Sequence, residues 1–515
     1  MHWNLKTHRQ GLDAAPGEPR DQTQGGWPRW CGPTALAALT LLSVCGSAAA
    51  QAPGSASSLP VEVEAALKRA RVPREAMVAV VEEVDANVPV LSWQPQQSVN
   101  PASVMKLFPT YAALDLLGPA WTWSTPVWLQ GQLVNPGPQG VLHGDLVIKG
   151  NGDPKLVMER VWLLLRRVQQ LGVREIRGDI VLDRSGFRVP AQNPADFDGE
   201  PLKPYNVSAD ALLLNYKSVV LTFTPDVARN VALVSMDPPM AQLQADASVP
   251  LSTAPCGDWR AGLKADFNNP QLLRLTGSYP ATCGERTWAV AYADPGSYNQ
   301  RALLGMWQSL GGQLSGKVRD GTAPTTPPTF ELASPSLTEV VRDINKYSNN
   351  VMAQQLFLTL GLTQRGTGTP EAAREVVRQW ALDRLGDTER ELVIDNGSGL
   401  SRESRVNAQL MAKLLQSAWS SPVMSELMSS LPVSGVDGTL KRSRVNQGRT
   451  HLKTGSLRDV VAVAGYVLHP NGRRYVLVAI VNHPEASAAR PAVEALVQWA
   501  SGPGVMRKPN ALDAR

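Results

Sequence analysis

The alternation of apolar and polar residues predicts two ends with mixed helices and strands, and a middle dominated by strands. Apolar residues recur at helical spacing over 60–70, and strand-like runs follow over 77–84 and 88–93. A second helix is predicted after Ser103. Pro109 lies so deep in that pattern that we expect a kink. This end of the chain therefore combines α and β elements.

From about residue 121 to 320 the pattern changes to short strands separated by turns rich in Gly, Pro and Asn. Helical spacing returns at Ser336, where Ser-Leu-Thr-Glu forms a capping box, and another helix is predicted from about Asn350. Three strands are then predicted at 451–456, 460–468 and 475–481, with an Asn-Gly hairpin between the last two. A final helix is predicted at 488–500. Both ends therefore resemble halves of one α/β domain around a β-rich insertion.

The first part of the chain has the pattern of a secretory signal. An apolar run of 11 residues over 34–44 is too short to span a bilayer, and small-residue cleavage signals follow it. We therefore expect the leader, 1–52, to be removed on export to the periplasm, with at most peripheral membrane contact. Residues 53–120 and 321–515 are expected to form one interrupted domain. The residues between them, 121–320, are expected to form an insertion of two small domains.

Composition excludes several classes of function. Hydrophobic residues make up 43% and charged residues 18% of the 515, which provides a sizeable core and excludes an intrinsically disordered chain. The net charge of +5 comes from scattered Lys and Arg, so nucleic-acid binding is not indicated. Histidines lack zinc-ligand spacing, and a phosphate-loop-like stretch at 311–317 meets Val318 instead of Ser or Thr. We expect no metal and no cofactor.

Two of the four cysteines, Cys31 and Cys45, lie in the leader. Cys256 and Cys283 remain, and in an exported chain they are expected to form one disulfide across a hairpin. Two buried free thiols are the alternative.

Three short motifs carry candidate chemistry. Ser103 and Lys106 lie three apart at a helix start and share one face, and a lysine with a lowered pKa can deprotonate a serine nucleophile. Ser348 and Asn350 lie at a polar junction between helices, and Lys-Thr-Gly at 453–455 lies on a strand before a hairpin. Each motif alone is more often structural. Their order and placement together favour acyl transfer at a serine.

These motifs resemble those of the penicilloyl serine transferases, which are penicillin-binding proteins and serine β-lactamases. The 245 residues between Ser103 and Ser348 are typical of the class C low-molecular-mass penicillin-binding proteins, the D-alanyl-D-alanine carboxypeptidase/endopeptidase family. Further stretches similar to that family lie at 144–156, 203–215 and 395–402. The resemblance implies an α/β (α+β) β-lactamase/transpeptidase-like fold, an antiparallel sheet flanked by helices, with the insertion between the first two motifs.

The resemblance also implies a role for each motif residue. Ser103 attacks the carbonyl of the penultimate D-alanine of a peptidoglycan stem peptide, and Lys106 accepts its proton. Ser348 passes a proton to the departing D-alanine. Asn350 holds the substrate amide and orients Lys106.

Substrate binding is implied for the Lys-Thr-Gly strand. Lys453, which must stay charged, and Thr454 bind the terminal carboxylate, while Gly455 lets the ligand approach the strand. The backbone N–H groups of Ser103 and Ser456 form the oxyanion hole.

Some assignments keep alternatives open. Asp183, Arg402 and Arg458 are candidates to contact the charged stem, with ordinary ion pairing as the alternative. Tyr347 and Asn349 also fit the Tyr-x-Asn of class C β-lactamases, although the insertion favours Ser348 and Asn350. A departure from the family is Asn396, which separates Asp395 from Gly397 where Asp directly before Gly is expected.

The sequence therefore predicts an exported serine D,D-peptidase that removes terminal D-alanine, cleaves D-alanyl cross-links, or does both. We expect β-lactam antibiotics to acylate Ser103. A serine β-lactamase and a non-catalytic wall-binding module are the alternatives.

Overall fold

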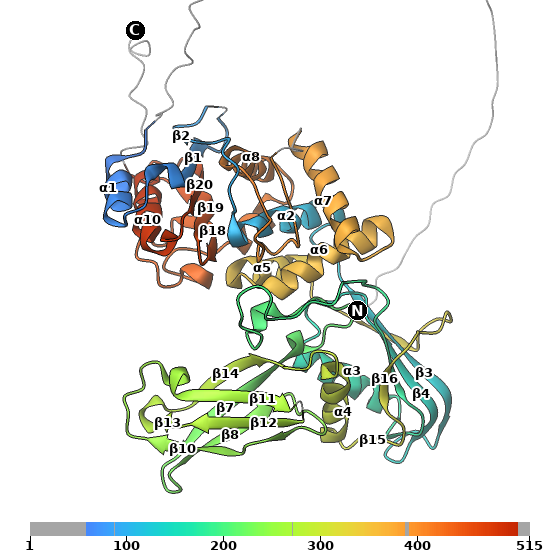
Figure 1. The fold of residues 1–515 in the computed structure, drawn as a ribbon. Coiled ribbons are helices and arrows are strands. Elements are labelled where there is room, and N and C mark those ends of the chain that lie inside the picture. The colour runs from blue at the N-terminus through green and yellow to red at the C-terminus, as the bar shows by residue number, and fades with distance from the viewer. Residues whose placement is uncertain (1–57, 87, 270, 387–390, 503–515) are drawn as a thin grey trace, which may run out of the picture. The chain divides into compact units, whose positions relative to one another are not determined.

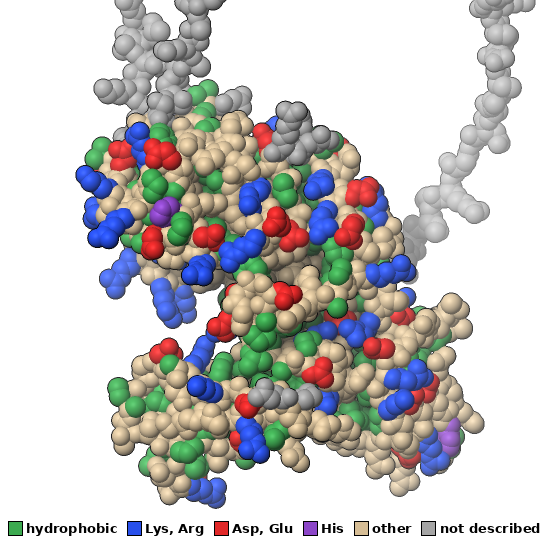
Figure 2. Space-filling model, viewed as in Figure 1, with side chains coloured by type: hydrophobic (Ala, Val, Ile, Leu, Met, Phe, Trp, Pro, Cys, Tyr) green, Lys and Arg blue, Asp and Glu red, His purple; other side chains and the backbone are tan. Residues whose placement is uncertain are grey.

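The structure is a computed structural model, which describes residues 58–86, 88–269, 271–386 and 391–502. The expected leader, 1–52, lies outside these residues. Within the described ranges, no helix is long and apolar enough to cross a membrane. Lys and Arg side chains are interspersed with Asp and Glu over the face in view (Figure 2), in line with the scattered charge of the sequence.

The two ends of the described chain meet in one antiparallel sheet of five strands, in the order β18-β19-β20-β1-β2 (Figure 1). The strands are β18 Thr450–Leu457, β19 Val460–Leu468, β20 Arg474–Asn482, β1 Met77–Glu83 and β2 Leu91–Trp93. The N-terminal β1 pairs along its whole length with the C-terminal β20, from Met77 opposite Val481 to Glu83 opposite Tyr475. The predicted union of the two ends is confirmed.

Side chains alternate between the two faces of this sheet, as a strand period of two requires. On β1, Met77, Ala79 and Val81 pack with the terminal helices, whereas Val78 and Val80 pack with the larger group of helices. The terminal helices are α1 Val61–Arg69 and α10 Arg490–Ala500. The larger group is α2 Leu107–Leu117, α5 Leu337–Tyr347, α6 Asn350–Arg365, α7 Pro370–Leu385, α8 Ala408–Trp419 and α9 Met424–Ser430.

The kink expected at Pro109 is absent from α2, because the helix begins later than the sequence pattern suggested. Residues 102–106 form the 3-10 turn η2, Ala102–Lys106, and α2 starts at Leu107. Pro109 therefore lies in the first turn of α2, where a missing N–H costs no helical hydrogen bond. The capping box is confirmed, since the Ser336 N–H donates to Glu339 Oε2 at 3.0 Å.

We call residues 124–333 the inserted region. Its strands form sheets ordered β13-β10-β8-β7-β14, β11-β12-β9 and β15-β5-β4-β3-β17, with β6 and β16 attached to the last. The strands are β3 Ser124–Val134, β4 Val141–Lys149, β5 Glu175–Ile176, β6 Ile180–Asp183, β7 Ser218–Asp226, β8 Val231–Asp237, β9 Gln244–Ala245, β10 Ser248–Ser252, β11 Leu263–Asn269, β12 Leu272–Gly277, β13 Tyr279–Pro280, β14 Arg286–Ala291, β15 Gln313–Leu314, β16 Val318–Asp320 and β17 Phe330–Ala333.

Two helices that the sequence analysis did not predict lie among these strands, α3 Met158–Gln170 and α4 Tyr298–Ser309. Their buried faces share one hydrophobic cluster with all three sheets. Because β17 pairs with β3, strand structure continues beyond residue 320. Cys256 and Cys283 form a disulfide that flanks the β11–β12 hairpin.

Candidate active site

The turn that carries Ser103 is held against the sheet by close backbone packing. A Cβ atom at Gly455 of β18 would lie 2.7 Å from the backbone oxygen that precedes η2, so a larger residue leaves no room for this contact. Ala102 has a φ of 48°, which is unfavourable for a residue with a side chain. Its N–H donates to Asn100 Oδ1 at 2.9 Å. Ser103 therefore follows a strained backbone position that neighbouring groups hold in place.

The Lys106 amine is fully buried among uncharged oxygen atoms. Its Nζ lies 2.9 Å from Ser103 Oγ, and it donates to Asn350 Oδ1 at 2.7 Å and to the Ser398 carbonyl at 2.5 Å. Burial, and then the nearby Lys453 ammonium, lower the pKa of Lys106 well below its ordinary value. A neutral amine has two N–H groups and one lone pair. When both N–H groups point at carbonyl oxygens, the lone pair is left for the Ser103 proton.

A second buried amine, Lys453 on β18, faces Ser348. Its Nζ donates to Ser348 Oγ at 2.9 Å and to the Thr454 carbonyl at 2.7 Å. Burial lowers the pKa of Lys453 to about 7. The charged form that carboxylate binding needs is therefore less favoured at Lys453 than at an exposed lysine.

The junction between α5 and α6 presents Ser348 and Asn350 to the two lysines. Ser348 ends α5 with a left-handed φ of 55°. Asn349 is used differently, because its Oδ1 caps α6 by accepting from the Met352 N–H at 3.1 Å. Tyr347 is 65% exposed. These contacts favour Ser348 and Asn350 over the Tyr-x-Asn alternative, although Tyr347 and Asn349 line the same cleft.

Sequence reasoning missed two groups that hold this arrangement. The Ser398 carbonyl contacts Lys106, and Thr439 Oγ1 lies 2.7 Å from Thr454 Oγ1, next to Lys453. A backbone carbonyl has no residue type that marks it. The family-like stretch at 395–402 was the available signal, and it gave no role for Ser398.

Four of the candidate site residues line one cleft of about 1150 Å³, and the two lysines are buried behind them. Ser103, Ser348, Asn350 and Ser456 line it, and Tyr205 and Tyr216 contribute to it from the inserted region. The Asn350 Nδ2 donates to the Tyr205 carbonyl at 3.4 Å. The inserted region therefore forms part of the candidate site.

Arg402 and Arg458 line the same cleft with exposed side chains. Arg402 is also held in place, because its guanidinium lies 2.9 Å from Asp459 and 4.7 Å from the centre of the Phe197 ring. Both arginines are therefore placed where an acidic ligand group can reach them.

Asp183, by contrast, does not line the cleft. Its side chain is buried at the end of β6 and accepts hydrogen bonds from the N–H groups of Ser185 and Ala323, both at 2.9 Å. Burial acts to raise its pKa, but these hydrogen bonds outweigh burial and lower it. The expectation of a substrate contact is corrected: Asp183 joins loops within the inserted region.

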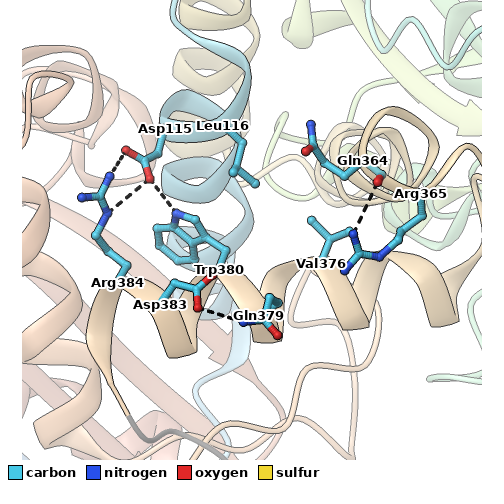
Figure 3. Close-up of a pocket in the computed structure, with 9 residues that line it drawn as sticks. All are labelled: Asp115, Leu116, Gln364, Arg365, Val376, Gln379, Trp380, Asp383 and Arg384. Atoms are coloured by element: carbon cyan, nitrogen blue, oxygen red, sulfur yellow. Dashed lines mark hydrogen bonds and ion pairs between the residues drawn. The ribbon is translucent and has the colours of Figure 1, made fainter. Parts of the chain in front are cut away.

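A smaller pocket of about 340 Å³ lies between α2, α6 and α7, and the motif residues do not line it. Figure 3 shows the Asp115 carboxylate between Trp380 and Arg384. Asp115 accepts from Trp380 Nε1 at 2.8 Å and pairs with the Arg384 guanidinium. These contacts fix α7 to α2, the helix that follows η2. Among the described residues, no group of His, Cys, Asp or Glu is placed to hold a metal ion.

The site thus combines a serine, a buried amine with a lowered pKa and a second hydroxyl bonded to a lysine, which are the groups that acyl transfer needs. A family model described as "D-Ala-D-Ala carboxypeptidase 3 (S13) family" matches residues 59–502. The chain belongs to this S13 family. The predicted recognition is confirmed, and with it the enzyme class, a serine-type D-Ala-D-Ala carboxypeptidase.

Individual relatives agree with this assignment. The D-alanyl-D-alanine carboxypeptidase of Actinomadura sp. (strain R39) is 30% identical over 412 residues, which cover 76% of this chain and 75% of that protein. The crystal structure of penicillin binding protein 4 from Haemophilus influenzae matches with a TM-score of 0.65 and 19% identity, over 85% of this chain and 100% of that one. A predatory endopeptidase from Bdellovibrio bacteriovorus matches with a TM-score of 0.50 and 15% identity, over 82% and 92%. These matches confirm the predicted fold class.

Proposed function

We propose that this S13 carboxypeptidase is exported and acts on peptidoglycan stem peptides through an acyl-enzyme on Ser103. The observation that carries the proposal is the 2.9 Å contact between Ser103 Oγ and the buried Lys106 Nζ. A serine hydroxyl becomes an effective nucleophile when an adjacent base takes its proton.

Acylation begins when the Ser103 proton moves to Lys106 and Oγ attacks the carbonyl carbon of the penultimate D-alanine. The backbone N–H groups of Ser103 and Ser456 donate to the oxyanion that forms. Asn350 orients Lys106 through Oδ1, at 2.7 Å from Nζ, and its Nδ2 faces the substrate amide.

The peptide C–N bond then breaks, and Ser348 relays the proton that Lys106 took from Ser103 to the departing amine, which returns Lys106 to its neutral form. Lys453 donates to Ser348 Oγ, which leaves the Ser348 O–H free to point at the leaving nitrogen. In its charged form, Lys453 binds the terminal carboxylate together with Thr454. Water hydrolyses the ester on Ser103 and completes the cycle.

A cleft of about 1150 Å³ accommodates more than a terminal dipeptide, which supports cleavage of D-alanyl cross-links beside trimming of terminal D-alanine. Arg402 and Arg458 are proposed to meet acidic groups of the stem peptide. The proposed periplasmic location rests on the leader pattern of the sequence.

Labelling with a fluorescent penicillin tests the residue assignment, because a β-lactam presents a strained amide and a carboxylate to the same groups. Peptide mapping of the adduct is expected to find the label on Ser103. The Ser103→Ala variant is expected to fold normally and remain unlabelled, while Ser425→Ala, at an exposed serine on α9, labels like the parent. Labelling that persists in Ser103→Ala would contradict the nucleophile, and rapid turnover in place of a stable adduct would favour a β-lactamase.

A further inference from the structure

The loop that supplies the Ser398 carbonyl is organised by the side chain of Asn396. Asn396 Oδ1 accepts from the Ser398 N–H at 3.0 Å and from Ser398 Oγ at 2.8 Å. Asn396 Nδ2 donates to the Leu400 carbonyl at 2.9 Å, and the Leu400 N–H donates to Ser398 Oγ at 3.2 Å. One amide thus bridges both sides of the loop, and Ser398 between them is fully buried.

The loop is also pressed directly against the nucleophile turn. Gly399 has a φ of 73°, and a Cβ atom there would collide with the backbone oxygen of Ala102. The loop therefore cannot move toward η2, and the Asn396 bonds restrain it on the other side. The Ser398 carbonyl is held 2.5 Å from Lys106 Nζ as a result.

The Ser398 carbonyl decides how the Lys106 amine is oriented. Together with Asn350 Oδ1, it accepts both N–H groups of the neutral amine, so the lone pair faces Ser103. If this carbonyl turned away, the amine would be free to rotate and donate to Ser103 Oγ. A donated hydrogen bond would oppose removal of the Ser103 proton.

The loop also keeps negative charge away from Lys106. Asn396 is neutral, and the carboxylate of the preceding Asp395 lies 3.3 Å from Arg374 on α7. Charged groups on the elements around Lys106 include Lys453 on β18, Arg342 on α5, Arg458 after β18, and three ion pairs. These pairs are Lys346–Asp437 and Lys155–Asp343 on α5, and Arg402–Asp459 at the loop's end.

We infer that Asn396 is a positioning residue for the general base: its amide aims the Ser398 carbonyl at Lys106 and leaves that side of the site uncharged. The inference rests on the proposed role of Lys106. In this chain the amide makes all three contacts, whereas a carboxylate accepts the two Ser398 bonds but has no N–H for the Leu400 carbonyl. A carboxylate would also stabilise the protonated form of Lys106.

The test is the second-order rate constant of acylation by a penicillin, measured against pH in the full chain. In Asn396→Asp, the midpoint of the rising limb is expected to move up by about one pH unit, which lowers the rate on that limb about tenfold. In Asn396→Ala, the plateau is expected to fall about tenfold without an upward shift of the midpoint. Asn471→Asp is the matched control, because Asn471 Oδ1 accepts from the Arg473 N–H at 3.0 Å in an exposed turn, and it is expected to change neither quantity.

A purely structural role predicts a lower plateau and an unmoved midpoint in both variants, and that result would overturn the inference. If Asn396→Asp does not fold, as judged by circular dichroism, folded Asn396→Ala decides, because a parental rate there would refute the role. Mapping of the adduct in the parent chain distinguishes a failure of this inference from a failure of the proposed function. If Ser103 is labelled but both Asn396 variants keep the parental plateau and midpoint, this inference alone is overturned. If Ser103 is not labelled, the proposed function is overturned and the inference with it.

Discussion

The inserted region and the catalytic cleft both bury lysine side chains, but they treat the charge in opposite ways. In the inserted region, Lys217 Nζ lies 2.7 Å from Asp210 Oδ2, and Arg184 binds the same carboxylate. In the cleft, Lys106 and Lys453 are bonded to hydroxyl and carbonyl oxygens. A carboxylate stabilises an ammonium, whereas neutral acceptors leave an amine free to lose its proton. The bonding partner therefore distinguishes a lysine that supports the fold from the two lysines to which we assign roles in the proposed mechanism.

Lys346 shows that the partner, and not the distance from the cleft, makes this difference. It lies two residues before Ser348, yet its Nζ is 2.6 Å from Asp437 Oδ2. Burial acts to raise the pKa of Asp437, but the hydrogen bond from Lys346 helps to lower it. The pair is a structural contact at the edge of the site.

The largest expected effect comes from Lys106→Arg. A guanidinium keeps its proton throughout the working pH range, so it cannot act as the base. We expect acylation by penicillin to fall about 10³-fold, as measured by stopped-flow or gel labelling. Lys413→Arg, at an exposed lysine on α8, is the control and should be unchanged. A near-parental rate in Lys106→Arg would show that another group takes the proton.

Lys453→Arg is expected to have a smaller effect, which depends on pH. The role proposed for Lys453 needs positive charge, and its pKa of about 7 means that this charge is lost as the pH rises. The parental acylation rate at low penicillin concentration should therefore fall about tenfold per pH unit above this value. The guanidinium of the variant stays charged, so its rate should start lower but lack this falling limb. Equal losses in both arginine variants would contradict the two assigned roles.

The sequence was most informative where chemistry depends on side chains at short spacing. Ser103 and Lys106 lie in one turn, and the strand of the Lys-Thr-Gly motif follows from its own pattern. Burial of Lys453 depends on which distant residues cover it, so its lowered pKa could not be predicted. The contact of Arg402 with Asp459 joins residues 57 apart in the chain, and no local pattern marks it.

The fold was predictable in the interrupted α/β domain and less so in the inserted region. Helices α3 and α4 were missed because the short strands and turns around them dominate the pattern of that region. The prediction of a kink at Pro109 was wrong for a different reason. The start of a helix is fixed by backbone geometry, and a 3-10 turn of five residues moved it.

A further pair of variants tests the comparison through stability. Lys217→Met leaves the Asp210 carboxylate buried with one partner fewer, so the free energy of unfolding should fall by about 3 kcal/mol. Lys453→Met removes a buried amine whose charged form destabilises the folded state. Its unfolding free energy at pH 6 should not fall below that of the parent, although acylation is impaired.

The pH dependence of this pair gives a further check. Between about 7 and the ordinary lysine pKa of about 10.4, the unfolded chain binds more protons at Lys453 than the folded chain does. Parental stability should therefore gain on that of Lys453→Met as the pH rises through this range. Urea unfolding at several pH values measures both effects. A large loss of stability in Lys453→Met would show that this lysine, too, supports the fold.

The smallest effect on catalysis is expected from the disulfide, which belongs to the inserted region. Cys256 and Cys283 close a loop of 27 residues, and loop-closure entropy assigns the bond about 3.5 kcal/mol. Replacing both cysteines by serine should lower the unfolding temperature and leave the acylation rate within about twofold of the parent, because neither residue lines the cleft. Non-reducing peptide mapping of periplasmic protein should find Cys256 joined to Cys283. Two freely alkylated thiols would refute the bond, and a large drop in acylation by a folded double variant would show that the inserted region transmits strain to the cleft.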